Sequence, residues 1–119
     1  MGMGGVNADD PAFKAFVEAH TALAGQGPDF WASAATYATL EVLGQAIEAV
    51  GSADRAAVLT HLQDRANSYE TILGPVNFNE NNDNERYWTV GQWQNGVFRG
   101  VAARGRDGAV DVQLFDGWN

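Results

Sequence analysis

The sequence has no cysteine, few basic residues and no long apolar run. Without cysteine the chain forms no disulfide and has neither a thiolate metal ligand nor a cysteine nucleophile. The 15 Asp and Glu outnumber the 7 Lys and Arg, and the formal net charge of -8 repels the phosphates of nucleic acids and of anionic membranes. No apolar stretch approaches the roughly 20 residues that span a bilayer. We therefore expect no nucleic-acid partner and no membrane insertion.

The 119 residues fit one small globular domain, because 45% are hydrophobic and only 18% are charged. Residues 1–8 are mostly small or polar and are expected to form a flexible leader. A single α+β domain is expected over residues 9–119. Residues 1–10 have neither the basic start nor the apolar stretch of a secretory signal. For the chain as written, this predicts a cytoplasmic location.

Three helices are predicted in succession, over residues 11–24, 30–50 and 53–66. Each is preceded by a residue that can cap a helix start: Asp10, Asp29 and Ser52. Glycines follow the first two helices: Gly25 and Gly51.

Apolar residues at helical spacing indicate which helix faces are buried. In the second helix the expected inward stripe is Tyr37, Leu40, Leu43, Ile47 and Val50. Further apolar residues surround the same helix and suggest that it is covered on more than one side: Trp31, Ala34, Ala35, Ala38 and Val42. In the third helix the expected inward residues are Val58, Leu59, Leu62 and Ala66.

From Tyr69 onward the pattern changes from helical to β-type. Short runs over 71–73 and 76–78 are predicted to be broken by a turn at Gly74-Pro75. Asn95-Gly96 suits the two positive-φ positions of a type I′ turn, so a β-hairpin is expected there and is expected to pack on the second and third helices. Alternation over 110–114 predicts a last edge strand.

The residues that could carry chemistry do not form a catalytic or metal-binding motif. An alternating set resembles the oxygen ligands of a calcium loop: Asn77, Asn79, Asn81, Asp83 and Glu85. Its register fails, since counting from Asn79 puts Asn84 where the required glycine belongs. His20 and His61 lie on different predicted helices, and no nucleophile motif accompanies them. The sequence therefore predicts neither an enzyme, nor a metal site, nor a cofactor.

The start of the second predicted helix is the most promising binding site. Unpaired backbone N–H groups point outward at a helix start and can hold an anion or an amide. Residues 31–33 would provide such groups beside an apolar wall, with Ser33 as the polar side chain.

Four stretches, in this order and spacing, resemble a known family. They are Phe30-Trp-Ala-Ser-Ala-Ala-Thr-Tyr-Ala-Thr-Leu40, Ala46-Ile-Glu-Ala-Val-Gly-Ser-Ala-Asp54, Thr71-Ile-Leu-Gly-Pro-Val-Asn-Phe78 and Tyr87-Trp-Thr-Val-Gly-Gln-Trp-Gln-Asn-Gly96. Together they resemble the C-terminal part of type I periplasmic solute-binding proteins, the receptors of ABC importers for branched-chain amino acids and amides. The resemblance covers Phe13 to about Ala103.

The resemblance implies a fragment or truncated homologue of a two-lobed α/β receptor, in which three helices precede a β-hairpin and short strands. It implies a periplasmic location, an ABC permease partner and an amino acid or amide ligand that the isolated chain binds weakly or not at all. The ligand-approaching positions carry over to Trp31, Ala32, Ser33 and Tyr37.

Two further expectations follow. The missing strands leave apolar surface, which predicts a homodimer through strand edges or through the 11–24 helix. The alternative to a solute receptor is a self-standing protein-interaction module with no small-molecule ligand.

Overall fold

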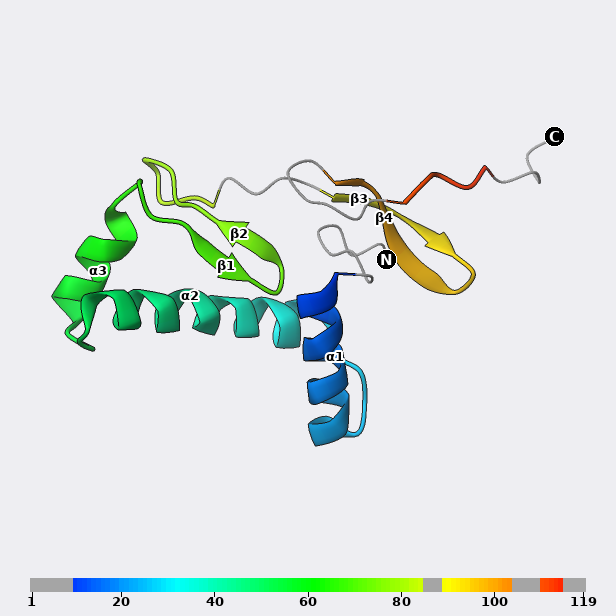
Figure 1. Ribbon diagram of the computed structural model, residues 1–119, viewed down its shortest axis with the longest axis horizontal. Helices are drawn as coiled ribbons and strands as arrows, with labels where there is room; N and C mark the ends of the chain where they lie inside the picture. The colour runs from blue at the N-terminus through cyan, green and yellow to red at the C-terminus, as the bar shows by residue number, and fades with distance from the viewer. Residues whose placement is uncertain (1–9, 85–88, 104–109, 115–119) are drawn as a thin grey trace. The chain divides into compact units, whose positions relative to one another are not determined.

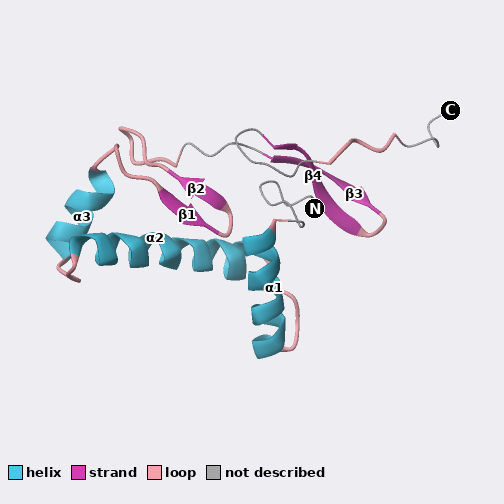
Figure 2. Ribbon diagram, in the orientation of Figure 1, coloured by secondary structure: helices cyan, strands magenta, loops and turns pink. Residues whose placement is uncertain are grey.

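A computed structural model of the protein describes residues 10–84, 89–103 and 110–114 (Figure 1). The elements in chain order are α1 (Pro11–Ala24), the π-helical segment η1 (Phe30–Ala34), α2 (Ala35–Val50), α3 (Arg55–Gln63), β1 (Tyr69–Thr71), β2 (Gly74–Val76), β3 (Thr89–Gln94) and β4 (Val97–Ala103) (Figure 2). This confirms the predicted α+β class. The chain divides into two compact units. One is Pro28–Arg86, and the other combines Met1–Gly27 with Tyr87–Asn119.

Helix α1 begins and ends where the sequence predicts. The side chain of Asp10 accepts hydrogen bonds from the N–H groups of Ala12 and Phe13, and Pro11 occupies the first helical position. Gly25 ends the helix with φ 72°, and its N–H donates to the carbonyl of Thr21.

Among the described residues, no helix has the length and apolar character needed to cross a membrane.

The unit over 28–86 is built on α2. The antiparallel hairpin β1–β2 lies along this helix, and α3 folds back from the helix's C-terminal end (Figure 1). Four buried residues form its core: Val42, Ala46, Val58 and Tyr69. Partly buried side chains pack around them: Ile47, Leu62, Val76 and Phe78.

Two side chains of α2 hold the hairpin by its backbone. The Gln45 amide makes two hydrogen bonds to Glu70: its Nε2 donates to the carbonyl (2.8 Å) and its Oε1 accepts from the N–H (3.2 Å). One turn earlier, Oε2 of Glu41 accepts from the N–H of Ile72 (2.8 Å). The Gln45 side chain thus pairs with β1 as a neighbouring strand would. We call these contacts of Gln45 and Glu41 the hairpin clamp.

The buried face of α2 differs from the predicted stripe of larger residues. The hairpin side carries small side chains, and the least exposed are Ala34, Ala38, Val42 and Ala46. Tyr37, Leu40 and Leu43 are instead 46%, 60% and 42% exposed. Small side chains are required there because Gln45 reaches the backbone of β1, and Glu41 that of the hairpin turn, only if helix and hairpin approach closely.

Helix α3 is shorter than predicted at both ends. Asp54, rather than Ser52, is the N-cap, because its carboxylate accepts from the N–H of Ala57 while the Ser52 hydroxyl accepts from Asp54 itself. Val58 is buried and Leu62 packs on the core, as predicted. Leu59 is 54% exposed and Ala66 lies beyond the helix in an exposed turn, so the inward assignment is wrong for both.

The turn of the β1–β2 hairpin also lies two residues earlier than predicted. Ile72 and Leu73 form the turn, and Gly74-Pro75 begins β2. The Thr71 hydroxyl causes this placement, since it donates to the carbonyl of Gly74 (2.7 Å) and accepts from the N–H of Leu73 (3.1 Å). Pro75 is exposed on its strand, where no ladder N–H is needed.

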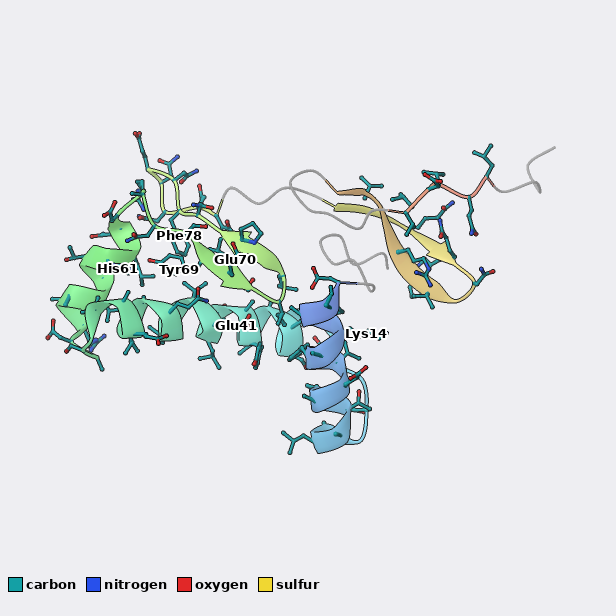
Figure 3. The ribbon with its side chains drawn as sticks, viewed as in Figure 1. Lys14, Glu41, His61, Tyr69, Glu70 and Phe78 are labelled. Atoms are coloured by element: carbon teal, nitrogen blue, oxygen red, sulfur yellow. The ribbon has the colours of Figure 1, made fainter. Side chains whose placement is uncertain are left out.

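Tyr69 connects the hairpin to α3 (Figure 3). Its hydroxyl donates to the carbonyl of His61 (3.3 Å). Its ring meets the His61 ring edge-on, with the ring centroids 6.0 Å apart, and lies at a tilt to the Phe78 ring, with the centroids 6.4 Å apart. Burial raises the pKa of the Tyr69 phenol, the charge of Asp64 adds to this rise, and a hydrogen bond with Asn67 opposes it. The phenol is therefore neutral at physiological pH.

In the other unit, the predicted hairpin turn is confirmed. Asn95 and Gly96 have φ values of 53° and 79°, as a type I′ turn requires, and they join β3 to β4. A register shift between Val90 and Gly91 marks an irregularity in the ladder. Because this hairpin belongs to the second unit, its predicted packing on the second and third helices stays a prediction.

The predicted strand over 110–114 is wrong, because this segment is held mainly by side chains rather than by a strand ladder. Gln92 donates from Nε2 to the carbonyl of Gln113 (2.6 Å) and accepts at Oε1 from its N–H (2.8 Å). Gln94, which is 5% exposed, donates to the carbonyl of Asp111 (2.9 Å). One backbone bond, from Val110 to Gly100, completes the attachment.

The hairpin clamp predicts a stability difference between two glutamine variants. Gln45→Ala removes both hydrogen bonds to Glu70, together with the bond from Nε2 to the carbonyl of Glu41 (3.0 Å), and is expected to lower the free energy of unfolding by about 1–2 kcal/mol. Gln63→Ala is the matched control, because Gln63 is exposed at the end of α3. Urea unfolding followed by circular dichroism measures both. Equal stabilities for the two variants would contradict the clamp.

Candidate functional site

The segment before α2 is shaped by a single carboxylate. The N–H of Ala34 donates to the carbonyl of Asp29, five residues back (3.1 Å), which gives η1 its π-helical form. The Asp29 side chain accepts from the N–H of Ala32 through Oδ1 and from the Ser33 hydroxyl through Oδ2 (3.4 Å). Asp29 therefore caps the start of the predicted 30–50 helix, although this start is the π-helical η1, and α2 itself follows from Ala34 without a side-chain cap.

The four predicted ligand-binding residues lie on two consecutive elements. Trp31, Ala32 and Ser33 belong to η1, and for Trp31 only the backbone is described. Tyr37 lies in the first turn of α2 and is 46% exposed. The structure thus brings Ala32 and Ser33 together on the Asp29 carboxylate, and it places Tyr37 one turn further along.

The chemistry of this helix start separates the two ligand groups expected there, an anion and an amide. The Ala32 N–H and the Ser33 hydroxyl already donate to a carboxylate of the chain itself. A second anion would meet the negative charge of Asp29 there. The local charge instead favours a ligand group that donates hydrogen bonds, such as an ammonium or an amide N–H.

A second candidate is an apolar pocket of about 290 Å³ where α2 meets the β1–β2 hairpin. The lining residues that the structure describes are all uncharged: Ala35, Ala38, Thr39, Val42, Thr71, Leu73, Val76, Phe78 and Asn84. The volume lies at the lower end of the range for small-ligand pockets, about 300–1,000 Å³. Among the predicted residues whose side chains the structure describes, neither Ala32, Ser33 nor Tyr37 lines it.

The polar groups of the pocket bond to the protein itself. The Thr39 hydroxyl donates to the carbonyl of Ala35 (2.9 Å), and Thr71 holds the hairpin turn. Asn84 accepts at Oδ1 from the N–H of Asn77 (3.3 Å). Because these polar groups already bond to the protein, the described lining offers apolar contact to an aliphatic or aromatic group. It presents no acid, base or nucleophile.

The side chain of Asn79 holds the asparagine-rich loop through the backbone N–H groups of the loop itself. Oδ1 of Asn79 accepts from the N–H groups of Asn81 (2.9 Å) and Asp83 (3.0 Å), which is the pattern of a polar turn. Glu85, the last member of the calcium-like set, lies outside the described residues. In the part of the chain that the structure describes, no group of His, Asp or Glu side chains could hold a metal ion.

The two histidines serve different local contacts. Nδ1 of His20 lies 3.1 Å from the carbonyl of Gln26, just beyond the end of α1. His61 contacts Tyr69 and lies near Asn67, whose Nδ2 donates to the His61 carbonyl (2.8 Å). Both sets of contacts are structural.

The pocket was missed by the sequence analysis for a definable reason. Ala38 and Val42 were recognised as apolar, but the larger residues of the helix were expected to face inward. One feature of the sequence does indicate the face that packs on the hairpin. Glu41 and Gln45 lie four residues apart, on the same face of the helix as Ala38 and Val42.

A family model for periplasmic binding proteins matches residues 4–97, most of the chain. The chain belongs to the periplasmic binding protein family. This confirms the resemblance found in the sequence. A comparison with curated proteins finds no match.

Two solved structures are similar to this chain. One is the leucine-binding protein LivK from Thermotoga maritima, with 29% identity and a TM-score of 0.58 over 80% of this chain. The other is an ABC transporter substrate-binding protein from Desulfitobacterium hafniense in complex with Leu, with 25% identity and a TM-score of 0.64 over 82% of this chain. The chain spans 27% and 30% of their lengths.

The apolar pocket predicts that a larger side chain stabilises the unit. Ala35→Leu places an isobutyl group at the pocket wall and is expected to raise the free energy of unfolding by about 1 kcal/mol, because apolar surface leaves water. Ala56→Leu, on the exposed surface of α3, is the control. Thermal unfolding measures both. A lower melting temperature for Ala35→Leu than for the control would show that the pocket has no room.

Proposed function

We propose that this chain is part of the solute-binding component of an ABC importer for branched-chain amino acids or related amino acids and amides. The observation that carries the proposal is family membership over residues 4–97, together with two similar structures whose descriptions name leucine. A binding role is proposed rather than catalysis, because both similar proteins are described as binding proteins.

The proposed ligand contacts are the residues around η1. Trp31, Ala32, Ser33 and Tyr37 are the proposed set, and Asp29 joins it because its carboxylate organises Ala32 and Ser33. A carboxylate at this point favours the ammonium of an amino acid over its carboxylate. Binding to the chain by itself is expected to be weak, since the chain spans under a third of each similar structure.

The partners and location follow from the same proposal. In the complete receptor the partner would be an ABC permease, and the compartment would be the periplasm that gives the family its name. We also propose that the segment corresponds to the C-terminal part of such a receptor. Self-association of the chain, which the sequence predicts, does not depend on solute binding.

A protein-interaction module without a small-molecule ligand is the second candidate. It is favoured by the large apolar side chains that α2 exposes, Leu40 at 60% and Leu43 at 42%. Such a surface suits a protein partner better than a small solute.

Three related ligands test the solute proposal by NMR titration. Leucine and leucinamide both carry an ammonium, whereas 4-methylpentanoate has the same aliphatic chain without it. We expect saturable shifts at Ala32, Ser33 and Tyr37 with the first two ligands only, beginning at millimolar concentration. Shifts with 4-methylpentanoate alone would contradict the role given to Asp29.

Two capping variants serve as test and control. Asp29→Asn keeps a good helix cap but removes the charge, so leucine binding should weaken by about twofold to fivefold, the worth of an exposed ion pair. Asp54→Asn makes the same change at the cap of α3 and should bind leucine as the unaltered chain does. If none of the ligands shifts any resonance, the solute proposal fails and the interaction module takes its place.

A further inference from the structure

The tip of the β3–β4 hairpin carries the sole Asn-Gly pair of the sequence, Asn95-Gly96. The side chain of an asparagine can close a five-membered ring with the next backbone nitrogen, and a side chain on that next residue hinders the closure. Glycine has no Cβ atom, so it hinders the closure least. A Cβ atom added to Gly96 would meet nothing within 4 Å, so the surrounding chain also leaves this position open.

Both reacting groups lie at the surface and outside the strand ladder. Asn95 and Gly96 are exposed, and the last ladder pair before the turn is Gln94 with Val97. Ring closure requires rotation about the Cα–C bond of Asn95, so it takes place when the turn opens. The tip of a two-stranded hairpin opens more readily than a packed core.

The other asparagines of the described chain are protected by their surroundings. Each is followed by a residue that has a side chain: Asn67, Asn77, Asn79, Asn81, Asn82 and Asn84. All of them except Asn81 also have a side chain held by a hydrogen bond. The Asn67 amide, for example, donates to the carbonyl of His61 (2.8 Å). Selectivity for position 95 therefore follows from both the sequence and the contacts.

We propose that Asn95 is a site of spontaneous covalent modification by deamidation. The backbone nitrogen of Gly96 gives its proton to hydroxide and attacks Cγ of Asn95. The N–Cγ bond forms, the Cγ–Nδ2 bond breaks, and Nδ2 takes up a proton from water and leaves as ammonia. Water then opens the cyclic imide at one of its two carbonyl carbons, which yields aspartate or isoaspartate. The reaction consumes only water, and it adds one negative charge to a chain of net charge -8.

The two products differ in their effect on the turn. Aspartate leaves the main chain unaltered and is itself favoured before glycine in a type I′ turn. Isoaspartate leads the main chain through Cβ and Cγ, which adds one atom to a two-residue loop whose positive φ values join β3 to β4. Gln94 directly precedes this loop, and its amide holds the carbonyl of Asp111 (2.9 Å). The isoaspartyl form therefore loosens the attachment of residues 110–114.

Incubation of the folded chain in mildly alkaline buffer at physiological temperature tests the site. After digestion in acid, mass spectrometry follows the gain of about 1 Da, and electron-transfer fragmentation distinguishes isoaspartate from aspartate. We expect Asn95 to react at least about tenfold faster than Asn67 or Asn77, because only Asn95 precedes a glycine. Equal rates at the three asparagines would overturn the proposal. It would also be overturned if Asn95 stayed intact while a free Gln-Asn-Gly-Val peptide reacted.

A matched variant separates the added charge from the altered main chain. Asn95→Asp carries the same charge on an unaltered backbone, so amide exchange at Gln113, whose N–H donates to Gln92 (2.8 Å), should stay slow. The isoaspartyl protein, isolated by chromatography, should exchange there about tenfold faster because the hairpin tip no longer closes. Equal exchange in the two proteins would overturn the loosening of residues 110–114.

Discussion

The unit over 28–86 depends on the close packing of helix α2 against the two-stranded hairpin β1–β2. A hairpin of two three-residue strands is marginal in water and needs a further surface or strand. The clamp supplies it, because Gln45 satisfies both backbone groups of Glu70 and Glu41 satisfies the N–H of Ile72. The close approach then requires small residues on that face of α2, which leaves the larger ones on the opposite face.

A second side-chain amide pairs with a backbone in the same way elsewhere among the described residues. Gln92 pairs with both backbone groups of Gln113 just as Gln45 pairs with those of Glu70, so a side-chain amide stands in for a strand in each unit. In both places the amide extends a two-stranded hairpin by one pairing.

Local signals in the sequence predicted local structure well. The caps at Asp10 and Asp29 and the Asn95-Gly96 turn depend on neighbouring residues and are confirmed. Features that depend on long-range contacts were misjudged: the buried face of α2 is set by bonds to residues 25 or more positions away, and the 110–114 segment is held by glutamines of β3. For the same reason the pocket was not foreseen, whereas the binding residues around η1 remain a prediction drawn from the resemblance.

Amide hydrogen exchange tests the clamp most directly. The N–H groups of Glu70 and Ile72 are expected to exchange slowly, as those in the interior of α2 do, because their acceptors are the side chains of Gln45 and Glu41. In the Gln45→Ala protein, exchange at Glu70 should accelerate about tenfold or more, while the amides of β3 and β4 keep their rates. If Glu70 and Ile72 of the unaltered protein exchange as fast as the amides of an open loop, the hairpin clamp does not hold β1 and its turn on α2.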